Sequence, residues 1–416
     1  MIPISRRRFL KVSGMGVAAL GALPATNFAQ ARRRVIVIGG GWGGATAAKY
    51  VRLTDPSIEV TLLEPNKEFI SCPFSNLVLA GVESLKNLTM NYNGLRKHGV
   101  KIRHEAAAAI EPDKKRVRVG KDSLEYDRLI VSPGIDFQWE LVEGLAPAKD
   151  TVLHAWKAGP QTVQLAKQLQ SLPDGGVVVM TVPPVAYRCP PGPYERASMI
   201  AWYLQTKKPK SKLIVLDANK DIVSKTGLFK AVFKDYANLD YRPSQKVEKI
   251  DVGAKEVTTE PGDKVKYDLI NLIPPQRAGA IAVEADLVGG DKRWCEVDHV
   301  TYESVKQKNI HVIGDATIGL PVPKSGNVAN ATLAALCDSD PVRLAKGKEL
   351  FGDKVRLFDS AEALFAARAV DAVMIATPHY FHPPLALEVL MLALPVLPAA
   401  GPPREEARET PAPIEA

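Results

Sequence analysis

The stretch that decides the fold is Val35-Ile36-Val37-Ile38-Gly39-Gly40-Gly41-Trp42-Gly43-Gly44. Its four β-branched residues predict a strand that is buried on both faces. Glycines then follow at G-x-G-x-x-G spacing, as Gly39, Gly41 and Gly44. In such a loop the first glycine permits a tight turn, the second lets a pyrophosphate approach the backbone, and the third lets the next helix pack closely on the strand. The stretch therefore predicts the start of a dinucleotide-binding βαβ unit.

The second strand of this unit ends in an acid. Residues 59–63 (Glu-Val-Thr-Leu-Leu) predict a strand, a helix is expected from about Gly44 to Leu53, and Glu64 follows the strand. A carboxylate at this position can accept hydrogen bonds from the ribose hydroxyls of a dinucleotide. Glycine-rich turns also occur without a ligand. Here the strand, the helix and the terminal acid are in register, which favours a binding site over a purely structural turn.

Two later segments favour FAD over NAD as the dinucleotide. Residues 126–134 end in Ser-Pro-Gly and resemble the strand and turn that re-enter the FAD domain in flavoproteins with two dinucleotide-binding domains. Residues 309–316 resemble the other FAD motif, in which an acid, here Asp315, contacts the ribityl chain. The alternative role of Asp315 is a strand-end cap. The predicted cofactor residues of this chain are Gly39, Gly41, Gly44, Glu64, Pro133, Gly134, Gly314 and Asp315.

Strands and helices alternate along the chain, which predicts an α/β fold with parallel sheets. The pattern is that of a flavoprotein with two dinucleotide-binding domains, of the glutathione-reductase type, followed by an atypical C-terminal α/β fragment. Further strands are expected at 101–104, 116–120, 126–131, 177–180, 212–216, 265–273, 309–313 and 371–376, with a helix at 194–206. The expected segments are a signal peptide (1–31), an FAD-binding domain in two parts (32–150 and 281–333), a second Rossmann-like domain (151–280), a C-terminal fragment (334–392) and a disordered tail (393–416).

The N-terminus carries an export pattern. Ser5-Arg6-Arg7-Arg8-Phe9-Leu10-Lys11 is a twin-arginine signature, and Ala29-Gln30-Ala31 is a small-residue cleavage site. The apolar run between them, Val12 to Leu23, is rich in Gly and Ala and is shorter than the ~20 residues that a membrane-spanning helix needs. The alternative is a short membrane anchor. We expect a twin-arginine signal peptide, a periplasmic protein and no stable membrane span.

Charge and cysteine usage exclude several function classes. The net charge falls from +8 to +4 when the four basic residues of the first 31 positions are removed, which is too mild for nucleic-acid binding. Four cysteines, at 72, 189, 295 and 337, are too few for a disulfide-scaffolded fold. None forms a C-x-x-C pair and the seven His are scattered, so no metal site is expected.

Residues 34 to about 333 resemble the flavoprotein subunit of flavocytochrome c sulfide dehydrogenase. The segments that carry the resemblance are 43–50 (GGATAAKY), 55–62 (DPSIEVTL), 154–159 (HAWKAG), 188–198 (RCPPGPYERAS), 271–279 (NLIPPQRAG) and 323–326 (PKSG). The resemblance implies sulfide as substrate, FAD as cofactor and a c-type cytochrome as partner. The missing glycine motif after residues 177–180 argues against an NAD(P)H-dependent reductase.

The resemblance also implies roles for two cysteines. Cys72 falls where the family links a cysteine sulfur covalently to the flavin ring; the alternative is a buried free cysteine. Cys189 matches one half of the family's redox-active disulfide and is the predicted catalytic residue. Arg188 and the helix expected from Tyr194 would favour its thiolate form.

The resemblance ends near residue 333. The family continues with a C-terminal domain that carries the second redox cysteine and contacts the cytochrome. Here residues 334–392 instead resemble part of the nucleotide-binding domain of the glucose–fructose oxidoreductase/inositol dehydrogenase family, without its glycine loop or catalytic lysine. Cys295 and Cys337 are the remaining candidate partners for Cys189, and neither pairing is favoured. Three functions stay open: a sulfide:cytochrome c oxidoreductase, a flavin-binding remnant without turnover and, less favoured, an NAD-dependent sugar dehydrogenase.

Overall fold

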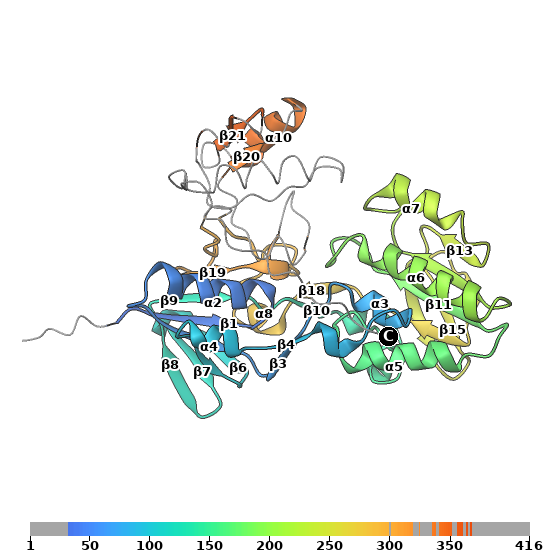
Figure 1. The fold of residues 1–416 in the computed structure, drawn as a ribbon, viewed down its shortest axis with the longest axis horizontal. Helices are drawn as coiled ribbons and strands as arrows, with labels where there is room; N and C mark the ends of the chain where they lie inside the picture. Colours follow the sequence, from blue (N-terminus) through green and yellow to red (C-terminus); the bar gives the residue numbers. More distant parts are fainter. Residues whose placement is uncertain are drawn as a thin grey trace, which may run out of the picture.

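The structure is a computed structural model that describes residues 32–298, 301–318, 324, 335–337, 341–351, 356–360, 363–364 and 367. It contains two large parallel sheets, each covered by helices (Figure 1). The predicted α/β fold with parallel sheets is therefore confirmed. The signal peptide (1–31), the strand at 371–376 and the tail (393–416) are predictions that lie outside the described residues.

The first sheet has the strand order β19-β9-β1-β2-β5, and all its strand pairs are parallel. Its strands are β1 (Arg34–Ile38), β2 (Glu59–Leu63), β5 (Lys101–Arg103), β9 (Arg128–Val131) and β19 (Ile310–Val312). Helix α2 (Trp42–Thr54) connects β1 to β2 and packs on both strands. Because the strands are parallel, the glycine loop, residue 64, residues 132–134 and residues 313–315 all follow carboxyl ends on one edge of this sheet.

The second sheet has the order β13-β12-β11-β17 and is also parallel. Its strands are β11 (Val177–Val182), β12 (Lys212–Asp217), β13 (Leu239–Arg242) and β17 (Leu269–Asn271), and its helices are α5 (Pro160–Ser171), α6 (Gly192–Lys207) and α7 (Thr226–Phe233). The predicted helix at 194–206 begins two residues earlier, at Gly192.

The prediction of one strand over residues 265–273 is wrong. The segment forms two short strands that belong to different sheets, β16 (Lys264–Lys266) and β17. The chain turns at Tyr267-Asp268, where the Tyr267 N–H donates to the Lys255 carbonyl at 3.0 Å and the Asp268 carboxylate accepts from the Val177 N–H at 2.8 Å. The residues of this segment do not reveal the turn, because the hydrogen-bond partners that fix it lie elsewhere in the chain.

Small antiparallel sheets flank the large ones. They are β6 (Ala107–Glu111), β7 (Arg116–Val119) and β8 (Asp122–Glu125); β14 (Val247–Asp251), β15 (Glu256–Thr259) and β16; β3 (Glu68–Ile70) and β4 (Thr89–Asn91); and β10 (Ile135–Phe137) and β18 (Gln276–Ala278). The short α-helices are α3 (Ser75–Leu79), α4 (Asn93–Lys97) and α8 (Ala280–Glu284), and the 3-10 helices are η1 (Leu85–Leu88), η2 (Pro112–Lys114), η3 (Trp139–Leu141), η4 (Ala146–Ala148) and η5 (Gly314–Ala316). β10 lies where the chain leaves the first large sheet, and β18 lies where it leaves the second. Their pairing therefore joins the two segments that connect the sheets.

Helix α3 brings the first domain against the second. It packs on α5 and α6, and its residue Asn76 is buried there. Buried apolar residues of both large sheets, such as Ile36 and Leu213, belong to one continuous core. The contact places the Cys72 segment, which precedes α3, next to the second domain.

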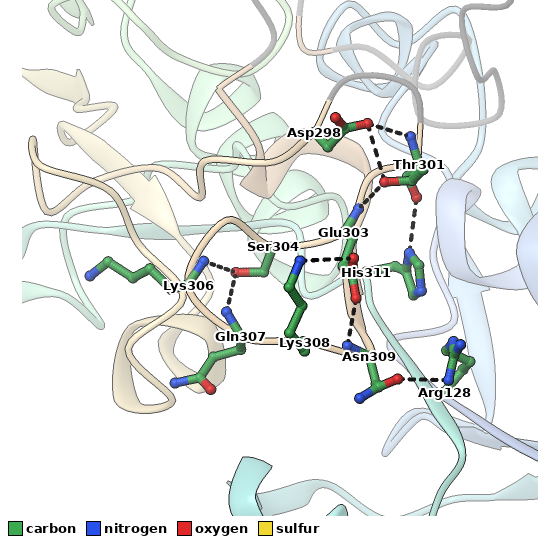
Figure 2. A network of polar contacts seen from close by, with 10 residues as sticks. All are labelled: Arg128, Asp298, Thr301, Glu303, Ser304, Lys306, Gln307, Lys308, Asn309 and His311. Atoms are coloured by element: carbon green, nitrogen blue, oxygen red, sulfur yellow. Dashed lines mark hydrogen bonds and ion pairs between the residues drawn. The ribbon is translucent and has the colours of Figure 1, made fainter.

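A polar network fixes the segment that returns to the first sheet (Figure 2). The Asn309 N–H donates to the Glu303 carboxylate at 2.7 Å, and the Arg128 guanidinium donates to the Asn309 side-chain carbonyl at 2.7 Å. His311 bonds the Thr301 carbonyl at 2.9 Å. These bonds hold β19 in register with β9, which sets the position of residue 315 beyond it.

The C-terminal elements that the structure describes are β20 (Ala335–Cys337), α10 (Pro341–Phe351) and β21 (Arg356–Phe358). β20 and β21 pair in parallel as a separate two-stranded sheet, and Figure 1 shows it apart from the two large sheets. The family assignment of residues 334–392 stays a prediction.

Candidate active site

The glycine loop has the geometry of a phosphate cradle. A Cβ on Gly39, whose φ is +95°, would lie 2.2 Å from the Ser132 carbonyl oxygen, and one on Gly44 would lie 1.9 Å from the Gly39 carbonyl oxygen. Both positions therefore require glycine. At Gly41 a Cβ would meet nothing within 4 Å. The open side of Gly41, at the N-terminus of α2, leaves room for an anionic group to approach the backbone.

Glu64 braces this loop. Its carboxylate, 8% exposed, accepts hydrogen bonds from the Gly40 N–H and from the Asn66 backbone and side-chain N–H groups, each at 2.8 Å. The Tyr92 hydroxyl donates to the Gly40 carbonyl at 3.2 Å. Contact of Glu64 with a ribose stays a prediction. Asn66 and Tyr92 were missed, because no local pattern marks a side chain that reaches the loop through packing.

The ends of β9 and β19 complete the edge of the sheet. The Ser132 N–H donates to the Ile38 carbonyl at 2.8 Å, so the Ser132-Pro133-Gly134 turn lies beside the glycine loop. Gly134 has φ +65° and an open Cβ position, and Gly314 has φ +74°. One carboxylate oxygen of Asp315 is buried without a partner among the described residues, and burial raises the pKa of this group. A buried acceptor beside an open glycine cradle fits a cofactor that carries hydroxyl groups, as the ribityl chain of FAD does.

Cys72 lies in contact with the second domain. It follows β3, is half-buried, and accepts a hydrogen bond to its Sγ from the Ala158 N–H at 3.5 Å. The same Sγ lies 3.8 Å from the Trp156 carbonyl oxygen. The sulfur is therefore held between the two domains.

Cys189 is held in a tight loop between β11 and α6. Its N–H donates to the Lys324 carbonyl at 2.8 Å, and its carbonyl accepts from the Gly192 N–H at 2.8 Å. A Cβ on Gly192 would lie 3.0 Å from Cys189 Sγ. Gly192 therefore lets the sulfur sit against the first turn of the helix.

The Arg188 charge and the Gly192 N–H at the start of α6 both favour the Cys189 thiolate by lowering its pKa, as predicted from the sequence. Burial raises the pKa of the Cys189 thiol to about 11, which outweighs the lowering by the Arg188 charge, while Glu195 and Asp315 raise it further. The sequence shows which charges are near in the chain but not how much water the fold removes.

Trp156 contacts Cys72 and the start of α6, which packs on Cys189. Its carbonyl lies against Cys72 and accepts a hydrogen bond from the Arg188 guanidinium, and its ring lies 2.8 Å from where a Gly192 Cβ would be. Its Nε1 and the Nε2 of Gln276 are buried without partners among the described residues. Gln276 Oε1 accepts from the Arg188 N–H at 2.9 Å, so its amide is oriented beside Cys189. Neither Trp156 nor Gln276 was singled out from sequence, although both lie in segments that carried the family resemblance.

Comparisons with known proteins agree with this site. Residues 162–274 match the family described as "Sulfide dehydrogenase (flavocytochrome c) flavoprotein chain, central", and residues 33–179 match "Pyridine nucleotide-disulphide oxidoreductase". The sulfide dehydrogenase (flavocytochrome c) flavoprotein chain of Chlorobaculum thiosulfatiphilum is 63% identical over 46 residues, which are 11% of this chain and 96% of that sequence. The chain belongs to the family of sulfide-oxidising flavoproteins.

More distant relatives cover more of this flavoprotein. The mitochondrial sulfide:quinone oxidoreductase of Dictyostelium discoideum is 24% identical over 331 residues, which are 74% of this chain and 69% of that protein. The solved structure of the sulfide:quinone oxidoreductase from Aquifex aeolicus superposes with a TM-score of 0.63 at 21% identity, covering 77% of this chain and 78% of that one. The likeness to the Aquifex aeolicus structure shows the fold, and it confirms the predicted two-domain flavoprotein architecture.

In the second domain, protein groups occupy the carboxylate that would correspond to a ribose-binding acid. Asp217 ends β12, as Glu64 ends β2 in the first domain. It is fully buried, and it accepts hydrogen bonds from the Tyr194 and Tyr241 hydroxyls and from the Asn219 backbone and side-chain N–H groups, each at 2.8 Å. A ribose could not reach this carboxylate, which agrees with the missing glycine motif.

Cys295 of the flavoprotein is a core residue. It is fully buried, burial raises its pKa to about 12, and its N–H donates to the Ala316 carbonyl at 2.9 Å. Cys72, Cys189 and Cys295 are all free thiols, so the Cys189–Cys295 pairing that the sequence left open is not formed. The side chain of Cys337 lies outside the described residues.

Within the part of the chain that the structure describes, no cluster of three or more His, Cys, Asp or Glu residues could hold a metal ion. No helix in that part is long and apolar enough to cross a membrane.

His154 gives the flavoprotein a predicted acid sensitivity. Its ring packs on Phe137 with centroids 4.3 Å apart, and its Nδ1 accepts from the Trp156 N–H at 2.8 Å. Burial, together with the Lys157, Arg196 and Arg188 charges, lowers its pKa from 6.5 to about 3. The unfolded chain therefore binds a proton at this residue below its ordinary pKa, whereas the folded chain does not.

The free energy of unfolding should fall as the pH drops from about 6.5 toward 3, with a slope from this residue of up to ~1.4 kcal/mol per pH unit. His154→Asn keeps an acceptor for the Trp156 N–H but cannot be protonated. Urea denaturation of both proteins across this pH range should give a shallower pH slope for the variant. Equal slopes would show that His154 does not contribute.

Proposed function

We propose that this chain is the flavoprotein of a sulfide dehydrogenase, which oxidises sulfide with FAD and passes the electrons to a c-type cytochrome. The observation that carries the proposal is that Trp156 links the segments of the two cysteines: its carbonyl oxygen lies 3.8 Å from Cys72 Sγ, and its ring lies against Gly192, which also packs on Cys189 Sγ. FAD is predicted to bind at the carboxyl-end edge of the first sheet, with its adenosine end at the glycine loop. Bound FAD would supply a two-electron acceptor next to a sulfur site.

The residues at this edge fit FAD. The glycine loop would hold the pyrophosphate, Glu64 the adenosine ribose and Asp315 the ribityl chain. Asp315 supports this arrangement because its unpaired buried oxygen needs a donor. Cys72 is proposed to tether the flavin covalently. Its half-buried Sγ lies where the two domains meet, so a sulfur link there would fix the ring end between them.

Cys189 is proposed to handle the sulfur. It is half-buried, so a small anion can reach it, and the Arg188 charge and the oriented Gln276 amide surround it. Hydrosulfide is a small anion, and these groups would hold it near the thiol. Cys189 forms no disulfide with Cys72 or Cys295, the other two cysteines whose side chains the structure describes.

The cytochrome is favoured as acceptor by two observations. The family model for the central part of the flavocytochrome c flavoprotein chain covers residues 162–274, which include the Cys189 loop. The relative with the higher local identity is also a flavocytochrome c flavoprotein chain. The quinone-reducing relatives keep a second candidate open, with quinone as the acceptor. The predicted twin-arginine segment supports a periplasmic location, where c-type cytochromes are found.

An anaerobic sulfide titration tests the proposal. The purified FAD-loaded protein should lose its visible flavin absorbance when sulfide is added, and the absorbance should recover when oxidised cytochrome c is added. Addition of a soluble ubiquinone analogue in a parallel sample tests the quinone alternative. NADH should not bleach the flavin, because Asp217 is occupied by the protein itself. Full FAD content without sulfide bleaching would contradict the proposal and favour a flavin-binding remnant.

A further inference from the structure

Arg196 is a fully buried cation close to the sulfur site, which is the pair Cys72 and Cys189. Its side chain is 1% exposed and lies on α6. Its guanidinium donates to the side-chain carbonyls of Asn76 at 2.9 Å and Asn271 at 3.0 Å, and to the backbone carbonyls of His154 at 2.9 Å and Ala155 at 2.7 Å. Four hydrogen bonds therefore fix the group between the two domains.

All four acceptors are neutral. Among the described residues no carboxylate lies within ion-pair distance of Arg196. The adjacent Glu195 is exposed and accepts instead from Asn76 Nδ2 at 2.6 Å. Burial lowers the pKa of Arg196 to about 9, so the group is still protonated at neutral pH. A buried charge without a counter-ion is unfavourable, because the fold removes the water that would stabilise it.

Arg196 is linked to the Cys189 loop through the Trp156 ring. Arg196 stacks on the Trp156 ring at 4.8 Å, and that ring lies against Gly192, whose Cβ position is 3.0 Å from Cys189 Sγ. Arg196 and Gly192 are four residues apart on one helix and share a face. The Cys72 and Cys189 sulfurs both favour the protonated form of Arg196, and by reciprocity its charge favours an anion at Cys189.

We propose that Arg196 is the fixed counter-charge for anionic sulfur at Cys189, and that it positions the Trp156 segment between the two cysteines. The inference rests on the proposed function for the role of Cys189 in sulfide oxidation. The charge itself can be tested without turnover. Arg196 is a positioning residue, because it does not touch the Cys189 sulfur. It contacts the Trp156 ring, which packs on Gly192 beside that sulfur.

The test measures how fast iodoacetamide alkylates Cys189 as a function of pH, in the reduced, FAD-loaded, full-length protein. Mass spectrometry of the Cys189 peptide gives the rate. The thiolate is the reacting species, so the rate reports its fraction. Arg196→Gln should slow the alkylation about tenfold at each pH below the titration midpoint and move that midpoint upward. Arg196→Lys keeps the charge and should stay close to the wild type.

Other charges act on Cys189 and stay constant in these variants. Arg188 lowers its pKa, whereas Glu195 and Asp315 raise it. The matched control is Arg293→Gln, because Arg293 also stacks on a tryptophan, Trp294 at 5.5 Å, and donates to backbone carbonyls of the loop before Cys189. It should leave the alkylation profile unchanged.

Asn76→Asp in a Glu195→Gln background, compared with Glu195→Gln alone, covers the case in which Arg196→Gln does not fold, because the amide at position 195 can donate to the new carboxylate where Glu195 now accepts from Asn76 Nδ2. It keeps an acceptor for Arg196 Nε and places a carboxylate against the guanidinium, so it should also slow the alkylation. An unchanged profile in either variant, or an equal slowing in Arg196→Lys, would overturn the inference. Failure of sulfide to bleach the flavin would sink the proposed function but would leave the alkylation result standing, so the two failures are distinguishable.

Discussion

Cys189→Ser is expected to lower the rate of sulfide-dependent flavin reduction by roughly a thousandfold or more, while FAD binding is retained. A serine hydroxyl fits the loop, because Cys189 is held through its backbone by Lys324 and Gly192. It cannot carry sulfur as a persulfide or disulfide. Stopped-flow mixing with sulfide under anaerobic conditions gives the rate directly.

Cys295→Ala is the control for this prediction. Cys295 is fully buried in the core, so its replacement by the smaller alanine should leave the rate of bleaching unchanged in the folded fraction. An unaltered rate in Cys189→Ser would show that sulfide reaches the flavin without this thiol. The protein would then oxidise sulfide by a route that does not use Cys189.

Cys72→Ser is expected to convert FAD from a covalent to a dissociable cofactor. Acid precipitation of the wild type should leave the flavin in the pellet, whereas the variant should release nearly all of it into the supernatant. The folded variant should still hold FAD through the glycine loop and Asp315, because these lie on the edge of the first sheet. The flavin absorbance of pellet and supernatant gives the measurement.

Cys189→Ser serves as the matched control here, because it removes the neighbouring thiol without touching the tether and should keep its flavin in the pellet. Release of FAD from the wild type on precipitation would show that Cys72 is a free thiol. That outcome would leave the FAD site itself unaffected.

The sequence predicts the glycine loop well, because its requirements are local. Gly39 needs a positive φ and Gly44 needs the absence of a Cβ, and both constraints act within a few residues or on a neighbouring strand. The carboxyl-end positions of Glu64, Pro133 and Asp315 follow from the order of parallel strands. The sequence pattern and the strand order together therefore predict most of the residues at the carboxyl-end edge of the first sheet, where FAD is proposed to bind.

The sulfur site is less predictable, because it is made by packing between domains. Trp156 and Gln276 lie far from Cys189 in sequence, and the role of Arg196 comes from bonds to residues distant in the chain, including Asn76 of the first domain. The same reason explains why the burial of Cys189 could not be predicted. Charges can be read from neighbouring letters, but the desolvation that raises the Cys189 pKa to about 11 depends on the finished fold.

The pairing of β19 with β9 has a consequence for synthesis. Arg128 and Asn309, which bond at the start of these strands, are 181 residues apart in the chain. A ribosome-bound chain that has passed β9 already contains the glycine loop, but it lacks Asp315 and the edge strand until the whole second domain has emerged. We expect FAD binding to be one of the last steps in the synthesis and folding of this protein, after the second domain has had time to fold.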